Sequence, residues 1–425
     1  MSSEPSADWV RVTLAELIEV RHGFAFSGEF FTDDPTAFVV VTPGNFGIRG
    51  GFQATKLKYY KTDGPIPEEF VLNPCELIVT MTDLSREADT LGFAARIPDS
   101  GDLTYLHNQR IGKVVARNGS RVDLSYIHWL LRSPHYRHHV VATATGTTVK
   151  HTSPTRICEY SFALPPLDEQ RRIATVLGAL DDKIAHNKAV ASRVREVADV
   201  GFRERFLASP ARSRRALGDV VSLQKTSVAP AERPAELFEH FSIPAFDDGG
   251  VPSREPGAGI LSTKTRLPER DVILFSKLNP ATPRVWWPRP SGTGDAVCSS
   301  EFLVLVPDAV PATFLYASLR NDSALYEEII SHATGTTGSR QRVKPTDVLG
   351  CSMIGATQDE FESYDAFARP LHDLDAVLLR ESQHLGAIRD ALLPKLVSGA
   401  IRVPESYDAS DAQGTVEDAA GVAVP

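Results

Sequence analysis

The chain has 425 residues, with 45 Lys or Arg against 54 Asp or Glu and a net charge of −9. This length predicts two or three domains, and a content of 42% apolar and 23% charged residues is typical of folded proteins. The longest apolar runs, such as residues 302–306, are much too short to cross a membrane. Residues 1–8 lack the basic start and apolar stretch of a secretory signal, so we expect a cytoplasmic protein.

The four cysteines stand far apart along the chain. They are Cys75, Cys158, Cys298 and Cys351, and their smallest separation is 53 positions (351 − 298). This spacing never approaches the Cys-x-x-Cys pattern of zinc or redox sites. We therefore expect four reduced thiols and no metal site.

Residues 1–165 are expected to form a mixed α/β domain. Short β-branched runs at residues 38–42, 77–81 and 111–116 are separated by Gly, Pro and Asp. Between residues 103 and 160, eight Lys or Arg accompany two acidic residues, a net of +6 (8 − 2). The sequence thus places a local positive charge in the first domain of an acidic chain.

Residues 166–210 predict a long helix. Pro165 and Pro166 form a start signal, and apolar or small residues then recur with the period of 3.5 that is typical of a coiled coil. Asn187 fills the one polar position of this face. The helix face expected to be buried consists of Ile173, Leu177, Leu180, Ile184 and Val194.

Residues 211–357 repeat the organisation of the first domain. The pentapeptide Ala-Thr-Gly-Thr-Thr of residues 144–148 returns at residues 333–337, and the strand-like residues 76–81 correspond to residues 271–276. The order is shared but the offsets drift, which indicates one architecture with loop insertions. The chain is therefore expected to contain two copies of a unit of roughly 200 residues.

A second long helix is expected at residues 358–403. Its apolar face consists of Leu371, Leu374, Leu378, Leu385, Ile388 and Leu392, and Glu381 occupies the polar position. Two unpaired helices of this length would extend far beyond a domain. The fold class that we expect is α+β: two similar mixed α/β domains in tandem, each followed by a long helix, with the two helices paired as an antiparallel coiled coil. The simpler alternative is that each helix packs separately on its own domain.

Residues 404–425 form an acidic tail. They contain five acidic residues and no Lys or Arg, which is more than half of the excess of nine. Such a composition predicts disorder.

Catalytic signatures are missing from the sequence. It contains neither a Gly-x-x-x-x-Gly-Lys-Ser/Thr phosphate loop nor a His-Glu-x-x-His zinc motif. The Asn-Pro pairs at positions 73 and 279 are not followed by Pro and an aromatic residue, as an amino-methyltransferase motif would require. We expect a chain without catalytic residues or a bound cofactor of its own.

The positive charge and the repeated pentapeptide favour binding to DNA. Phosphate neutralisation supplies much of the affinity of DNA-binding proteins, while Arg and Gln read base edges in the major groove. The ordinary alternatives are a solvated basic surface and a structural turn. The residues that we expect to contact DNA are Arg110, Thr147, Thr148, Lys150, His151, Lys277, Thr336, Thr337, Arg340, Gln341, Arg342 and Lys344.

Three segments resemble one known family. Residues 164–174, Leu-Pro-Pro-Leu-Asp-Glu-Gln-Arg-Arg-Ile-Ala, are similar to the central repeat of the specificity subunits of Type I restriction-modification systems. Residues 392–403 are similar to their C-terminal repeat, and the Gly-Thr-Thr loops are similar to the ends of their target recognition domains. Residues 358–361, Gln-Asp-Glu-Phe, depart from the usual start of the second helix. The resemblance covers residues 9–404.

This resemblance implies a division of labour. Two target recognition domains, residues 1–165 and 211–357, would each read one half of a bipartite sequence in double-stranded DNA. The helices at residues 166–210 and 358–403 would act as the spacer. Two methyltransferase subunits, which bind S-adenosylmethionine, and restriction subunits, which use ATP and Mg²⁺, would be the partners.

Two other hypotheses compete with this one. A coiled-coil scaffold with duplicated protein-binding domains would not need Lys150, Arg340 or Arg342. An enzyme with an unrecognised site would show activity as a single chain.

Overall fold

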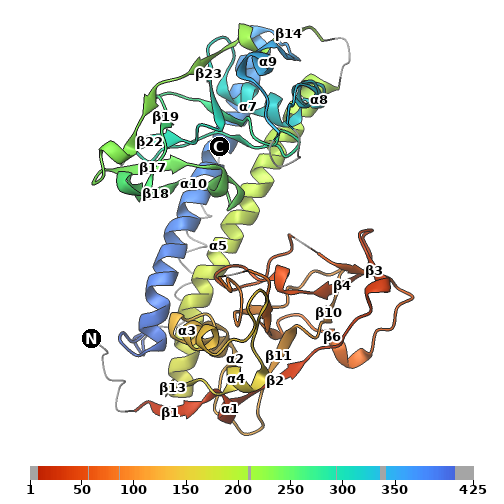
Figure 1. Cartoon of the computed structure of the whole chain (residues 1–425), viewed down its shortest axis with the longest axis vertical. Helices are drawn as coiled ribbons and strands as arrows, with labels where there is room; N and C mark the ends of the chain where they lie inside the picture. Colours follow the sequence, from red (N-terminus) through yellow and green to blue (C-terminus); the bar gives the residue numbers. More distant parts are fainter. Residues whose placement is uncertain are drawn as a thin grey trace. The chain divides into compact units, whose positions relative to one another are not determined.

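The structure is a computed structural model, and it describes residues 8–55, 57–85, 87–208, 212–292, 294–335 and 341–406. The chain forms two compact units (Figure 1). Unit 1 contains residues 1–183 and 384–425, and unit 2 contains residues 184–383. Most of the expected acidic tail lies outside the described residues. Within the described part, every helix is too short or too polar to span a lipid bilayer.

Unit 1 contains two main sheets. The first is antiparallel, with the order β2 (Ile18–His22), β11 (Ile111–Ala116), β7 (Leu77–Thr80) and β9 (Ala94–Arg96). The second has the order β3 (Phe31–Thr32), β5 (Tyr59–Tyr60), β4 (Phe38–Val41), β10 (Thr104–His107) and β6 (Val71–Leu72). Two short pairs join β1 (Val10–Thr13) to β13 (Ser161–Leu164) and β8 (Thr82–Asp83) to β12 (Lys150–His151). The unit's short helices are α1 (Leu14–Leu17), α2 (Leu124–Leu130), α3 (Pro134–Ala142) and α4 (Pro154–Cys158).

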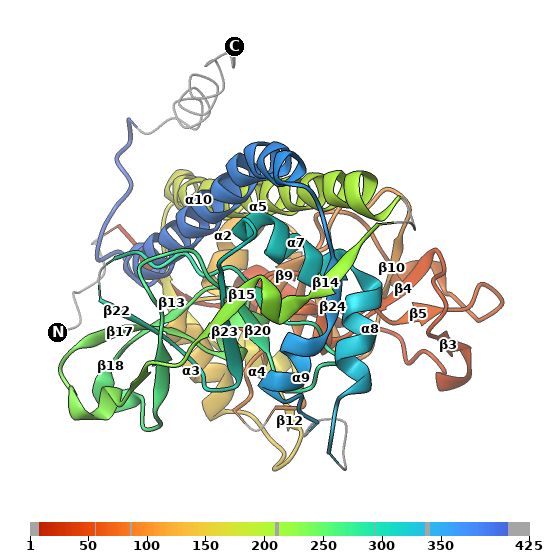
Figure 2. The ribbon, with the colours of Figure 1, turned by 90° about the horizontal axis from the view of Figure 1, so that it is seen from above.

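Unit 2 repeats this plan in the order of its strands, several of which are labelled in Figure 2. Its antiparallel sheet has the order β15 (Val221–Gln224), β23 (Phe302–Pro307), β20 (Ile273–Ser276) and β21 (Val285–Trp286). Its five-stranded sheet has the order β16 (Ser227–Val228), β19 (Lys264–Arg266), β22 (Asp295–Cys298), β17 (Leu237–Phe241) and β18 (Ser253–Pro256). β14 (Arg214–Ala216) pairs with β24 (Ser352–Ile354), and the short helices are α6 (Ile243–Asp247), α7 (Ala312–Asn321), α8 (Ser323–Ser331) and α9 (Pro345–Gly350).

The two units differ at the edges of their five-stranded sheets. Each of these sheets has one parallel pair at its centre, β4 with β10 and β17 with β22. The extra edge strand joins next to β5 in unit 1 and next to β19, at the opposite edge, in unit 2. The internal repeat predicted from the sequence is confirmed as one plan with a local rearrangement.

Two long helices, α5 (Leu167–Phe202) and α10 (Gln358–Val397), contribute to both cores. In unit 1, Ile173 and Leu177 of α5 share a buried cluster with Leu393 and Leu396 of α10. In unit 2, Phe202 of α5 shares a buried cluster with residues of α10. The start of α5 thus meets the end of α10 in one unit, and the reverse holds in the other, so the helices run antiparallel as expected. The expected domain boundaries remain predictions, because each unit contains part of each helix.

The sequence motif at the start of α5 ties this helix to the first domain. Gln170 is fully buried. Its side-chain oxygen accepts a hydrogen bond from the Asp123 backbone N–H (2.9 Å), and its side-chain nitrogen donates to the backbone oxygens of Arg121 (3.1 Å) and Pro165 (2.8 Å). The amide therefore replaces backbone partners that the chain lacks where it turns from β13 into α5.

The end of α10 closes on the same unit. Gly399 has φ +77°, the left-handed conformation that commonly ends a helix. A Cβ there would lie 3.2 Å from the Trp9 ring, so the glycine also permits close packing. Trp9 Nε1 donates to Glu169 of α5 over 3.1 Å, and Arg402 pairs with the Asp8 carboxylate. The helix end and the close packing on Trp9 therefore explain why a glycine occupies position 399 in the C-terminal repeat.

α10 begins with a capping box rather than the proline signal of α5. The Thr357 backbone N–H donates to Glu360 Oε2 (2.8 Å), and the Glu360 N–H donates to Thr357 Oγ1 (3.3 Å). Arg212 also pairs with Glu360 at 2.8 Å and, with the Thr357 N–H, lowers the pKa of the Glu360 carboxyl to about 2. Although residues 358–361 depart from the usual sequence, α10 therefore still has a defined N-terminus.

Burial on α5 agrees with the expected face, whereas burial on α10 departs from it at two positions. Ile173, Leu177, Ile184 and the polar Asn187 are buried on α5, and Leu180 and Val194 are partly buried. On α10, Leu374 and Ile388 are 42% and 37% exposed. The partly buried members of the expected α10 face are Leu371, Leu378, Leu385 and Leu392.

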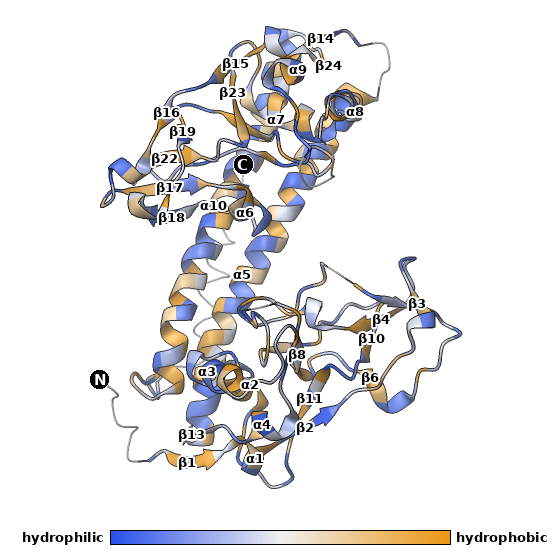
Figure 3. Ribbon diagram, in the orientation of Figure 1, coloured by the Kyte–Doolittle hydropathy of each residue, from blue (hydrophilic) through white to orange (hydrophobic). Residues whose placement is uncertain are grey.

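The buried positions of α10 include small and polar residues that lie about one position along from the expected leucines. Ala368, His372 and Ser382 are buried instead. Asn187 Nδ2 donates to Glu381 Oε2 over 2.8 Å, so the two predicted polar positions interact. A pattern that counts only apolar residues misses such a face, and Figure 3 shows hydrophilic residues alternating with hydrophobic ones along both helices.

A buried ion pair in unit 1 gives the first test. Arg132, with a side chain only 4% exposed, donates to Asp181 over 2.7 Å, and Arg389 of α10 also pairs with Asp181. Burial alone would raise the pKa of Asp181, but the two guanidinium groups outweigh it and hold the pKa below its usual value. We expect Asp181→Ala to lower the free energy of unfolding by about 3 kcal/mol, because it leaves a buried charge without its partner.

The pH dependence of this loss has a defined sign. Because the pKa of Asp181 is lowered on folding, its ionised carboxylate stabilises the folded state at pH values above the unfolded pKa of about 3.9. This stabilisation is lost as the pH falls through the folded pKa. The difference between wild type and Asp181→Ala in urea unfolding should therefore shrink in acid. The control is Asp168→Ala, whose ion pair with Arg171 is exposed and should contribute less than about 1 kcal/mol. Equal effects of the two changes would contradict this assignment.

Two glycines of α5 give a second, matched test. A Cβ at Gly201 would lie 2.4 Å from Phe367 Cε1, whereas a Cβ at Gly178 would meet nothing within 4 Å. Gly178→Ala should stabilise the protein by about 0.5–1 kcal/mol through helix propensity. Gly201→Ala should be destabilising relative to it by about 1–3 kcal/mol, the usual cost of overpacking. Indistinguishable unfolding curves would show that the helices do not pack this closely.

Candidate nucleic-acid interface

The repeated pentapeptide lies in equivalent loops of the two units. In unit 1, Thr145 and His151 exchange two backbone hydrogen bonds of 2.9 and 2.8 Å, and in unit 2 Thr334 and Arg342 exchange two of 2.9 Å. Gly146 and Gly335 both have positive φ, +93° and +139°, which permits the tight turn after each threonine. The same pair of backbone bonds therefore closes both loops, which differ in length.

The expected contact residues of these loops are placed unevenly. Thr147 and Thr148 are exposed, and Lys150 and His151 form β12, where Lys150 is partly buried and His151 is exposed. Gln341 is partly buried and its backbone oxygen accepts from the Asn279 N–H (2.8 Å), while Lys344 is exposed at the start of α9. Thr336, Thr337 and Arg340 lie outside the described residues.

A strand end supports each loop with the same bonds. After β7, the Met81 N–H donates to the Arg110 oxygen (2.9 Å) and the Met81 oxygen accepts from the Thr152 N–H (3.0 Å). After β20, Lys277 makes the same pair of bonds with Glu301 (2.8 Å) and Val343 (3.2 Å). These shared bonds align the two units residue by residue.

The backbone bonds around each loop form a frame that is shared by the two units. The side chains on this frame differ between the units. Met81 corresponds to Lys277, Arg110 to Glu301, and His151 to Arg342. Lys277 and Arg110 thus lie beside the loops, and their contact with DNA stays a prediction. Two identical frames with unlike side chains can present different hydrogen-bonding groups to two different sequences.

In unit 1 the frame holds an imidazole. His151 Nδ1 and Thr82 Oγ1 lie 3.2 Å apart and share a hydrogen bond. Arg156 of α4 donates to Thr145 Oγ1 over 3.1 Å, which ties the loop to the helix that follows. The His151 ring is therefore oriented by Thr82, and the residue is exposed.

In unit 2 the frame holds an ion pair. Arg342 Nε and Nη2 donate to the two carboxylate oxygens of Glu301 over 3.1 and 2.9 Å. These hydrogen bonds lower the pKa of Glu301 below its usual value. A guanidinium fixed in this way keeps its direction, while about half of the Arg342 side chain remains exposed.

Several of the basic side chains of residues 103–160 have partners within the fold. Arg132 pairs with Asp181, Lys113 pairs with Glu76, and Arg137 donates to backbone oxygens of residues 88 and 91. The net of +6 therefore overstates the charge that this segment offers to a ligand. A sequence window counts such residues because their partners lie far away in the chain.

Sequence reasoning missed Thr82 and Glu301, which orient His151 and Arg342. The internal repeat carried a usable signal: extending the alignment of residues 111–116 with 302–307 by one position places Glu301 opposite Arg110. Thr82 gave no such signal, because a threonine after a strand is ordinary.

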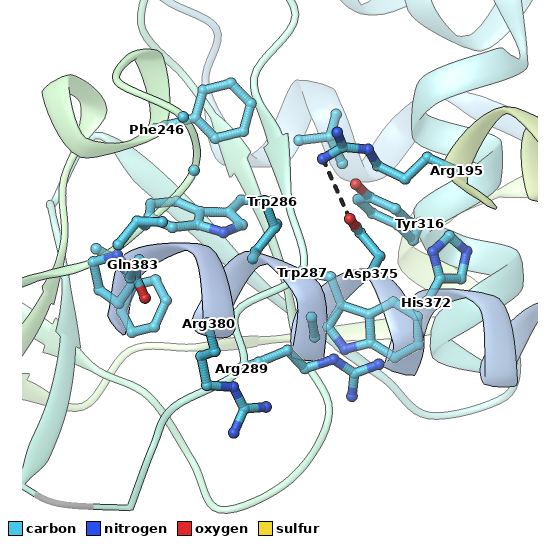
Figure 4. A pocket seen from close by; sticks show the side chains of 18 of the residues that line it. Arg195, Phe246, Trp286, Trp287, Arg289, Tyr316, His372, Asp375, Arg380 and Gln383 are labelled. Carbon is cyan, nitrogen blue, oxygen red and sulfur yellow. Dashed lines mark ion pairs between the residues drawn. The ribbon is translucent and has the colours of Figure 1, made fainter. Parts of the chain in front are cut away.

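Unit 2 also contains a pocket with a volume of about 440 Å³ (Figure 4). Phe246 and Trp286 lie on one side, and Arg195 lies on the other, 3.6 Å from Asp375. Burial lowers the pKa of His372 in this pocket to about 4, so its imidazole is neutral near pH 7. The pocket has a different lining from the loop frame and lies where α5 and α10 meet the domain of unit 2.

Comparison with known proteins agrees with this geometry. Residues 6–195 match the family described as the Type I restriction modification DNA specificity domain. The chain is 28% identical to the Type I restriction enzyme EcoBI specificity subunit of Escherichia coli, over 47% of this chain and 38% of that protein. It is 23% identical to the MjaIX specificity subunit of Methanocaldococcus jannaschii, over 70% of this chain and 73% of that protein. The match to the Escherichia coli protein thus spans well under two thirds of its length.

A solved structure shares the fold. The crystal structure of a Type I restriction-modification system S subunit from M. genitalium superimposes with a TM-score of 0.57 and 15% sequence identity, covering 93% of this chain and 99% of that one. The tandem units with two long antiparallel helices are therefore a known arrangement. Residues 6–195 thus carry the DNA specificity domain of Type I restriction-modification systems, and the chain as a whole is similar in sequence and fold to the specificity subunits of that family.

Proposed function

We propose that this chain is the DNA sequence-specificity subunit of a Type I restriction-modification complex. Each unit reads one half of a bipartite target in double-stranded DNA, and the paired helices serve as the spacer between the halves. The observation that carries the proposal is the duplicated frame with unlike side chains, because a bipartite target with two different halves requires two similar readers with different contacts.

The chemistry belongs to partner subunits in this proposal. Two methyltransferase subunits would bring S-adenosylmethionine, and restriction subunits would bring ATP and Mg²⁺, so this chain acts as a non-catalytic recognition subunit. The catalytic motifs that the sequence lacks are consistent with that role. Since its DNA and partners would lie in the cytoplasm, we place the chain there.

Methylation mapping tests the assignment of the halves. The chain is co-expressed with its partner methyltransferase subunit, and N6-methyladenine is mapped across the host DNA. We expect a bipartite motif with a fixed gap. His151→Ala should relax one base position in one half, and Arg342→Ala one position in the other, each by about 1–3 kcal/mol of discrimination.

The control for this experiment is Arg270→Ala. Arg270 is exposed and precedes β20, whereas the frame follows that strand, so this change should leave the motif intact. Both variants relaxing the same half would contradict the assignment. A motif unchanged by either variant would favour the scaffold hypothesis.

Salt dependence tests the phosphate contacts. In a gel-shift assay with the methyltransferase partner, affinity should fall steeply with salt. Lys150→Ala and Lys277→Ala should each weaken binding to all sequences alike and lower the salt slope by about one. Binding that is insensitive to salt would exclude the proposed interface, and methyl transfer by the single chain would instead support an unrecognised enzyme.

A further inference from the structure

A cluster of three potential metal ligands lies beside the pentapeptide loop of unit 2, which we call its recognition loop. Glu328 and His332 are one helical turn apart on α8 and its C-terminal cap, and Cys351 follows α9. One ligand atom from each of the three lies within 4.8 Å of the other two. Carboxylate, imidazole and thiolate are all common zinc ligands.

The cluster is supported from its surroundings. The Ser352 backbone N–H donates to Glu328 Oε2 over 2.8 Å, which orients the carboxylate as outer hydrogen bonds do in metal sites. Cys351 is fully buried, whereas His332 is exposed. A tetrahedral zinc ion with bonds of about 2.0–2.3 Å separates its ligand atoms by roughly 3.3–3.8 Å. Side-chain rotations that move the ligand atoms by about an ångström therefore bring them to zinc-binding distances. Water can fill the fourth position from the side of the exposed His332.

The ligand set is absent from the equivalent place in unit 1. The Leu14 N–H donates to the Tyr160 oxygen (3.0 Å) just as the Leu217 N–H donates to the Cys351 oxygen (2.9 Å), which aligns Tyr160 with Cys351. The offset of the pentapeptide aligns His139 with Glu328 and Thr143 with His332. The cluster is therefore not a requirement of the shared fold.

We propose that Glu328, His332 and Cys351 bind a zinc-type divalent cation that clamps the stem of the recognition loop in unit 2. His332 lies two residues before Thr334, where the loop begins, and Cys351 lies beyond α9, which follows the loop. A cation held by both His332 and Cys351 fixes the two chain segments that enter and leave the loop. This role in recognition rests on the proposed function, whereas the binding of the metal does not.

Cobalt(II) and zinc titrations of the purified full chain test the site without DNA. We expect one Co²⁺ per chain with the charge-transfer absorption of a thiolate–cobalt bond, displaced by Zn²⁺. Cys351→Ser should abolish that band, and His332→Ala should weaken Zn²⁺ binding by at least about tenfold. Because His332 is exposed, its variant folds even where Cys351→Ser does not. Cys298→Ser removes another buried thiol of the same unit and should change nothing.

Two results would overturn the proposal. One is a wild-type chain without a thiolate–cobalt band; the other is a band that survives both Cys351→Ser and His332→Ala. Methylation mapping of His332→Ala then tests the clamp: relaxed readout of the half assigned to unit 2 supports it, and unchanged readout of that half overturns it. Loss of metal binding with both halves still read would leave the proposed function intact.

Discussion

The structure depends on two long helices that must each bury one face along most of their length. A helix of this kind is unstable alone in water, since most of its stability comes from the packing of that face. Here the face is divided between two cores: Leu177 and Leu393 meet in unit 1, while Phe202 and Tyr364 meet in unit 2. Each domain is thereby anchored to both helices, and neither helix has an end without a partner.

This anchoring explains why the motifs that identify the family occur at the helix ends. Gln170 replaces missing backbone partners at the start of α5, and Gly399 ends α10 against Trp9. The recognition loops, by contrast, are closed by backbone bonds, such as those between Thr145 and His151. The side chains of His151 and Arg342 can differ because their backbones make the closing bonds, which suits a family whose members read different sequences.

Much of the fold could be predicted, because its periodicities are local in sequence. The duplication, the mixed domains and the buried face of α5 all follow from spacing. The face of α10 did not, because its buried positions include the polar residues His372 and Ser382, which an apolar count ignores. Of the candidate interface, Arg110 and Lys277 were chosen from charge and lie beside the loops, whereas the ion pair of Glu301 with Arg342 forms only in the folded structure. The cluster of Glu328, His332 and Cys351 was missed because its third ligand is 19 positions from its second (351 − 332).

The composition of unit 1 from two distant segments has a consequence for synthesis on the ribosome. Residues 184–383 are contiguous, so unit 2 can complete its core as soon as it emerges. Unit 1 waits for Leu393, Leu396 and Val397, which share its buried cluster with Trp9 and Ile173. Until then its apolar surface stays open, and contacts of such long sequence separation form slowly. The domain made first is thus finished last, and its unfilled surface is the part of the nascent chain most in need of a chaperone.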